Sequence, residues 1–303
     1  GLAMFSPSTK IIVRMYSVLI GNGINNIGKD NSWDNLIVQI CRHCKIKFPI
    51  DDEKKKHFPL LYEEIFLTAA RKNNISEADL KKFIAKIVSE IKPNGIHDQI
   101  RSLPIENILT TNYEFSLEGS KPKANSGVIK EKIYSIFRHV KIGKKKVWHI
   151  HGDCLHPSSI NLGFEHYGGQ LQQVRNYTAT GTNYQSGKIS KIPLISRLKY
   201  KNRLYSNSWI DLFFTTDIHI VGLTLGFVET ELWWLLTFRA RMKINNKISI
   251  PNKITYYLPQ RFEYESKNKL DLFRATDVEV VSINKLGESY YNEIIDRLHE
   301  IKT

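Results

Sequence analysis

Short hydrophobic runs alternate with amphipathic segments along most of the chain. The run at 16–23, YSVLIGNG, stays apolar until it reaches a glycine turn, which is typical of a buried parallel strand. Further runs of this kind predict strands at 106–114, 217–226, 253–259 and 278–283. The segment 132–153 predicts two more strands around a lysine-rich turn.

Apolar positions at helical spacing fill the intervals between these strands. Asn31-Ser32 can cap a helix that begins near Trp33. Ser76, followed by Asp79 three residues later, has the spacing of a helix start. The predicted helices cover 33–40, 59–72, 76–92, 229–242 and 290–301.

Strands that alternate with helices predict an α/β fold with a Rossmann-like, mostly parallel sheet and helices on both faces. Helical patterns follow one another over 51–102, so we expect a helical insertion at about 45–102. A chain of 303 residues is near the upper size of one hydrophobic core, and we expect a single domain over 16–303. Residues 1–15 are expected to form an N-terminal extension, partly a remnant of cloning, since no methionine precedes Gly1.

Composition narrows the class of protein. Hydrophobic content is 42% and charged content is 24%, as in ordinary globular proteins, and no stretch approaches the roughly 18 apolar residues of a membrane span. Three cysteines and the lack of a signal-peptide pattern predict a cytoplasmic location. The net charge of +14 favours anionic partners, although the densest runs, 54–56 and 144–146, are expected to be solvated surface.

Polar residues follow several of the predicted strands, at the ends where parallel sheets bind ligands. These polar ends are 21–26, 110–114, 222–226 and His151. Gly21 and Gly23 predict either a phosphate loop or a tight turn, because the spacing to Gly28 misses the G-x-G-x-x-G pattern. The asparagines beside them favour a ligand, since they have little other reason to cluster there: Asn22, Asn25 and Asn26.

Four short motifs follow one another along the chain: GNGIN, TTNYE, HGD and VGLTLG. In order and type they resemble the motifs of the sirtuin (Sir2) family. The match is closest to the divergent bacterial Sir2-like proteins of anti-phage defence, which hydrolyse NAD. The segments SWDNLI and INLGFEHYGGQL fit that branch better than the protein deacylases. The resemblance covers roughly residues 16–260 and implies a Sir2-like domain that binds NAD as its substrate.

The resemblance assigns roles position by position. Asn112 matches the asparagine that orients the ribose or a water beside the nicotinamide bond, and His151 matches the general base. The positions that match cofactor-binding motifs are Gly21, Asn22, Gly23, Asn25, Thr111, Glu114, Gly222 and Thr224. Asn22 and Asn25 stand where sirtuins have alanine and serine, and Glu114 replaces an aspartate, so its role stays open.

Two parts of the protein deacylases are missing from the sequence. GKDNSWDN replaces the arginine-containing loop after the glycine turn, and the four-cysteine zinc module is absent. No metal is expected, because Cys41, His43 and Cys44 lack a second cysteine pair. His149 alternates with His151 and is expected to be a packed or solvated side chain.

Together these features predict an NAD⁺ hydrolase that releases nicotinamide and ADP-ribose, acting as an NAD-depleting effector of abortive infection. Two alternatives stay open: an NAD-dependent protein deacylase, and a catalytically silent nucleic-acid-binding or scaffold protein on the same fold. An uncontrolled NAD-consuming enzyme would kill its host, so we expect control by a partner protein, a nucleotide signal or assembly into a homo-oligomer. Trp233 and Trp234 are expected in the core or in an oligomer interface.

Overall fold

The computed structural model describes residues 15–48, 56–123, 126–182, 184, 187–199, 207–245 and 248–302. These residues form a seven-stranded sheet in the order β3-β4-β2-β1-β5-β6-β7. The strands are β1 (Tyr16–Ile20), β2 (Asn107–Thr110), β3 (Val140–Ile142), β4 (Lys145–His149), β5 (Asp217–Val221), β6 (Ile254–Pro259) and β7 (Val278–Ile283). Neighbouring strands are parallel except β3 and β4, which form an antiparallel hairpin. The predicted α/β fold with a Rossmann-like, mostly parallel sheet is confirmed. Apart from Met15 and Lys56, the expected N-terminal extension and the basic run 54–56 lie outside the described residues.

The order of the strands changes direction at β1. On one side of this strand Leu19 lies opposite Leu109 of β2, and on the other side it lies opposite Ile220 of β5. The loops after β1 and β5 therefore leave the same edge of the sheet next to each other. This edge is the switch point at which open α/β sheets bind ligands.

Helices cover both faces of the sheet. One face carries α4 (Gly95–Arg101) and α10 (Gly287–His299), and the other carries α5 (Phe164–Arg175), α7 (Trp209–Thr215), α8 (Thr230–Ile244) and α9 (Lys267–Ala275). Successive residues of β1 serve opposite faces, since Leu19 joins the cluster with α8 whereas Val18 and Ile20 join the cluster with α10. The α8 tryptophans, Trp233 and Trp234, both pack against the core of their face.

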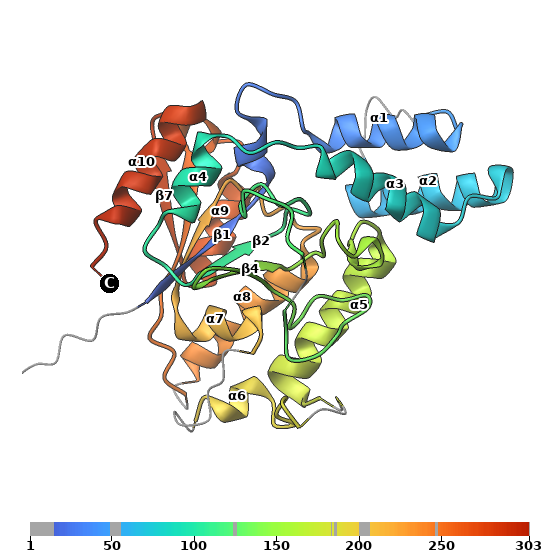
Figure 1. Ribbon diagram of the computed structural model, residues 1–303. Helices are drawn as coiled ribbons and strands as arrows, with labels where there is room; N and C mark the ends of the chain where they lie inside the picture. Colours follow the sequence, from blue (N-terminus) through green and yellow to red (C-terminus); the bar gives the residue numbers. More distant parts are fainter. Residues whose placement is uncertain are drawn as a thin grey trace, which may run out of the picture.

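Three helices form a separate group beside the sheet. They are α1 (Trp33–Cys44), α2 (Phe58–Asn73) and α3 (Glu77–Ser89), and Figure 1 shows them together at one side of the molecule. Their apolar faces share a hydrophobic cluster of their own, which includes Ile40, Tyr62 and Leu80. The helical group thus begins at Trp33 rather than near residue 45, and α4 packs on α10 over the sheet instead of joining the group.

Local sequence sets the starts of these helices. The hydroxyl of Ser32 accepts a hydrogen bond from the backbone N–H of Asn35, and that of Ser76 accepts one from Asp79 at 3.1 Å. The remaining helical turns are η1 (Asn22–Asn26), η2 (Pro157–Ser159), η3 (Asn176–Thr180), α6 (Leu194–Arg197) and η5 (Gln260–Phe262). In the described part of the chain, no helix combines the length and the apolar character that crossing a membrane requires.

Candidate functional site

The glycine turn after β1 packs directly against the loop after β5. The N–H of Gly23 donates to the carbonyl of Gly222 at 2.8 Å. A Cβ atom on Gly21 would lie 2.5 Å from the Gly222 carbonyl, and one on Gly23 would lie 2.4 Å from the Tyr291 hydroxyl. Both glycines are therefore required by the close approach of the two loops, so the tight-turn interpretation accounts for them without a phosphate.

Two pockets open on either side of this turn. We call the first the tyrosine pocket; it encloses about 360 Å³ and is lined by Gly23, Gly222, Thr224, Tyr256, Lys269 and Tyr291, among others. Its rim is held by α9 and β6, because the carbonyl of Thr224 accepts hydrogen bonds from Lys269 Nζ at 2.6 Å and Tyr256 Oη at 3.1 Å. The structure thus brings the predicted site residue Gly23 next to Gly222 and Thr224, which lie about 200 positions later in the sequence.

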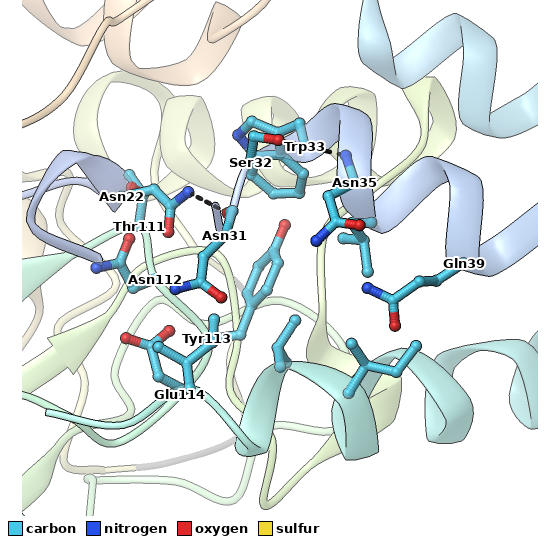
Figure 2. Close-up of a pocket in the computed structure, with 14 residues that line it drawn as sticks. Asn22, Asn31, Ser32, Trp33, Asn35, Gln39, Thr111, Asn112, Tyr113 and Glu114 are labelled. Carbon is cyan, nitrogen blue, oxygen red and sulfur yellow. Dashed lines mark hydrogen bonds between the residues drawn. The ribbon is translucent and has the colours of Figure 1, made fainter. Parts of the chain in front are cut away.

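We call the second the asparagine pocket (Figure 2). It lies between the strand ends and the helical group. Its polar wall comprises Asn22, Asn31, Asn35, Gln39, Thr111, Asn112 and Glu114. Its apolar wall comes from α1, α3 and the segment after β2, including Trp33, Val88 and Tyr113. Four of the predicted site residues therefore line one cavity, and Asn25 is buried next to them.

The asparagines of the turn bind one another. Asn25 Nδ2 donates to Asn22 Oδ1 at 2.9 Å, Asn22 Nδ2 donates to the carbonyl of Asn31, and Asn31 Nδ2 donates to the carbonyl of Asn25 at 2.7 Å. These contacts hold the loop between β1 and α1 in shape. The inference that these asparagines would cluster only to bind a ligand is therefore wrong, because the hydrogen bonds within the loop explain the cluster.

A buried relay, which the sequence patterns do not reveal, joins α4 to this turn. His97 Nδ1 accepts a hydrogen bond from the backbone N–H of Asn94, so its Nε2 carries the proton and donates to Asn25 Oδ1 at 2.8 Å. Asn25 Nδ2 in turn donates to Glu114 Oε1 at 3.0 Å. Burial lowers the pKa of His97 to about 4, which keeps the imidazole neutral, and burial raises the pKa of the Glu114 carboxyl. The relay fixes the carboxyl of Glu114 at the wall of the asparagine pocket.

Asn112 is anchored by its own side chain and backbone. Its Nδ2 donates to the carbonyl of Gly21 at 3.0 Å, and its carbonyl accepts from His149 Nδ1 at 2.7 Å. Among the described residues its Oδ1 has no hydrogen-bond partner, and the residue lines the asparagine pocket. This amide oxygen is therefore held in place and available to a ligand.

His149, the neighbour of the predicted general base, is a packed histidine. It is 2% exposed, and its Nε2 lies 2.5 Å from Glu118 Oε1. Burial opposes the charged form, but the Glu118 carboxylate outweighs burial and raises the pKa of His149 to about 9. Through the hydrogen bond from His149 Nδ1, the pair formed by His149 and Glu118 holds the backbone carbonyl of Asn112 in place.

The structure places His151 away from both pockets. The side chain is 2% exposed, lines neither cavity, and presents Nε2 to the carboxylates of Glu231 and, at 3.3 Å, Glu229 at the start of α8. Burial disfavours its charge, yet the two carboxylates together raise the pKa of His151. The two carboxylates thus favour the protonated imidazole, whereas a general base must start in the neutral form. The ring of Tyr167 packs edge-to-face against the His151 ring, with the ring centroids 5.3 Å apart.

His151, Glu229 and Glu231 also bear on metal binding. Their ligand atoms lie within 4.8 Å of one another, and no other group in the described ranges meets this criterion. Cys41 and Cys44 are instead buried in the apolar cluster of the helical group, where burial raises the pKa of both thiols. The expectation that the protein holds no metal stays a prediction.

No protein-family model matches the chain, and no curated protein matches it. The assignment to the Sir2-like family therefore stays a prediction from the motifs.

Proposed function

We propose that this protein cleaves the bond between nicotinamide and ribose in NAD, releasing nicotinamide and ADP-ribose. The observation that carries the proposal is the pair of pockets on either side of one glycine turn at the switch point of the sheet. A dinucleotide has two ends joined by a diphosphate, and this arrangement offers a cavity for each end with backbone between them. The motif resemblance supports the same ligand.

In this proposal the adenosine half occupies the tyrosine pocket, next to Gly222 and Thr224. The nicotinamide end enters the asparagine pocket, next to Asn22, Asn112 and Glu114, and this pocket of about 70 Å³ has to widen to admit the ring. Loss of nicotinamide leaves positive charge on the ribose, and a buried carboxylate at the pocket wall would stabilise that charge. The anchored Oδ1 of Asn112 would orient a ribose hydroxyl or the attacking water, whose oxygen bonds to the ribose carbon as nicotinamide departs with the bonding electrons.

His151 remains the proposed base that accepts the proton of that water. To do so its Nε2 must leave the carboxylates of Glu231 and Glu229, because this pairing occupies Nε2 and favours the protonated ring. We therefore interpret the structure as a resting form. A form of this kind agrees with the proposed role as a cytoplasmic NAD-depleting effector of anti-phage defence that a partner, a nucleotide signal or oligomerisation switches on.

The test is to express the protein in cells, to purify it as well, and to follow NAD and nicotinamide by chromatography. Asn112→Ala should lower NAD cleavage by at least about 100-fold while ADP-ribose binding, measured by calorimetry, persists. His151→Ala should be equally inactive and remain folded by circular dichroism. Asn268→Ala, at an exposed position on α9 outside both pockets, is the control and should cleave NAD at the wild-type rate.

Two results would contradict the proposal. Acetyl-ADP-ribose formed only with an acylated peptide would identify a protein deacylase. Unchanged NAD both in cells and in the purified sample, together with a shift of labelled nucleic acid, would identify a catalytically silent binding protein.

A further inference from the structure

A second hollow, far along the sheet from the glycine turn, gathers positive charge. It lies at the β3–β4 hairpin, between the segment 126–139 and the loop that carries Leu155 and His156, and it encloses about 970 Å³. We call it the basic groove. Its cationic lining residues are Lys123, Lys130, Lys132, Arg138, Lys141 and Lys146. None of them lines the tyrosine pocket or the asparagine pocket.

Little negative charge balances these six cations. Glu131 is the acidic residue that lines the groove, and its carboxylate accepts the backbone N–H groups of Ile136 and Phe137 at 2.7 and 2.8 Å. Within the described ranges, one of the five lysines forms an ion pair: Lys146 Nζ lies 3.8 Å from Glu106 Oε1. The groove therefore holds a net excess of positive charge that its own residues leave uncompensated.

The buried guanidinium of Arg138 has a free edge. Arg138 is 4% exposed, and its Nη1 donates to the carbonyl of Glu131 at 3.3 Å. Its Nε and Nη2 have no hydrogen-bond partner among the described residues. These two nitrogens present parallel N–H groups on the same edge of the guanidinium, which is the fork that binds two oxygens of one phosphate. A buried donor pair without an acceptor costs free energy unless a ligand supplies one.

Two neighbouring side chains, Asp153 and His139, affect what Arg138 can bind. The positive charge of Arg138 acts on the buried carboxylate of Asp153. The Oδ1 of Asp153 already accepts hydrogen bonds from the backbone N–H groups of Leu155 and His156. Neither ring nitrogen of His139 has a hydrogen bond of good geometry in the described structure, although the ring lies near the backbone of Phe137. Burial and the nearby lysines lower the pKa of His139 to about 4, so the ring is neutral and can donate one hydrogen bond without adding charge.

We propose that the basic groove binds a small ligand carrying more than one phosphate, with the Nε–Nη2 edge of Arg138 holding one phosphate. Six cations exceed the three nearby acidic side chains, Glu131, Glu106 and Asp153, and this excess matches a polyanion better than a single carboxylate. The volume of this open groove, about 970 Å³, lies in the range of small-molecule sites. Leu155 and His156 belong to the loop that follows His151, so an occupant of the groove would contact the loop next to this histidine. The site does not depend on the proposed NAD chemistry.

The probe is inorganic pyrophosphate, titrated into the purified full chain by calorimetry with ADP-ribose present to occupy any dinucleotide site. Lys141→Glu and Lys144→Glu form a matched pair, since both residues lie exposed on the same hairpin and both changes alter the net charge equally, but Lys141 alone of the two lines the groove. Lys141→Glu should weaken binding by at least about tenfold more than Lys144→Glu. Arg138→Lys keeps the charge but removes the fork and should also weaken binding by about tenfold.

ATP and adenosine distinguish a nucleotide from free phosphate as the source of the ligand. Tighter binding of ATP than of pyrophosphate, with no binding of adenosine, would assign a nucleotide; equal binding would assign the phosphates alone. Equal weakening by Lys141→Glu and Lys144→Glu would overturn the proposal, because a diffuse field would then explain the binding. So would the absence of pyrophosphate binding to the wild type at millimolar concentration, or binding of a single-stranded oligonucleotide that pyrophosphate does not displace. Because none of these measurements follows NAD cleavage, failure of the proposed function would leave their outcome unaffected.

Discussion

At the scale of single residues, the site consists of polar groups that other residues hold in place. Asn112 is held by Gly21 and His149, and Glu114 is held by Asn25. His151 is instead buried and held by Glu231, whose carboxylate favours the protonated form of the ring. The residue identities at the strand ends could be predicted from the motifs. The partners could not, because Glu231 belongs to a segment whose sequence indicates only an apolar helix.

The pair formed by His149 and Glu118 makes stability depend on pH. The pKa of His149 is raised from an unfolded value of about 6.5 to about 9, so the pair stabilises the fold fully below about pH 6.5 and loses its effect as the pH rises through 9. The upper limit of the contribution is about 3 kcal/mol. In urea unfolding followed by tryptophan fluorescence, Glu118→Gln should be less stable than the wild type at pH 6.5. The difference should shrink toward zero near pH 10. A difference that stays constant over this range would rule out the charged pair.

At the scale of elements, the strands and their polar ends follow from the sequence. The predicted strands at 16–23, 253–259 and 278–283 contain β1, β6 and β7, and the hairpin is where the lysine-rich turn indicates. The alternation of short apolar runs and helices is a local property, so it can be recognised without knowing what each element packs against.

Other elements and contacts cannot be predicted from the pattern of apolar and polar residues. The sequence does not predict α5, because the pair Gly168–Gly169 interrupts a polar segment; in the structure a Cβ atom on Gly169 would lie 1.7 Å from the Tyr134 hydroxyl. Nor does it predict that His97 of α4 contacts Asn25, since these residues are 72 positions apart. Contacts of this kind depend on tertiary packing and leave no periodic trace.

The packing of the loops after β1 and β5 makes a prediction at this scale. Gly23→Ala should destabilise the protein by about 1–3 kcal/mol, because its Cβ would lie 2.4 Å from the Tyr291 hydroxyl and 2.9 Å from the Gly222 carbonyl. Gly226→Ala is the control in the facing loop, where the nearest atom would be 3.9 Å away. Thermal unfolding of both variants measures the difference. Tyr291→Phe removes the nearer clash and should recover part of the stability of Gly23→Ala. Equal melting temperatures for Gly23→Ala and Gly226→Ala would contradict the packing argument.

At the scale of the whole molecule, the sealed environment of His151 bears on control. On the proposed function, the resting chain needs a rearrangement of the start of α8 before it can cleave NAD. We therefore expect slow turnover from the purified chain at nanomolar concentration, and a specific rate that rises with protein concentration or with an added activator. Nicotinamide release measured across a range of enzyme concentrations provides the check. Fast turnover that is independent of concentration would show that no such switch exists.

The order of the strands has one more consequence, for the protein while it is being made. The central pair, β1 and β5, joins segments about 200 residues apart, and the tyrosine pocket also needs Tyr291 of α10 against Gly23. β1 cannot pair with β5, and Gly23 cannot pack against Tyr291, until the later segment has been synthesised, and closing so long a loop then slows the pairing further. A half-synthesised chain therefore has the glycine turn but neither of the elements that close over it. If the protein consumes NAD, an unfinished copy cannot hold the whole dinucleotide, because the tyrosine pocket proposed for the adenosine half is incomplete until α10 has been made.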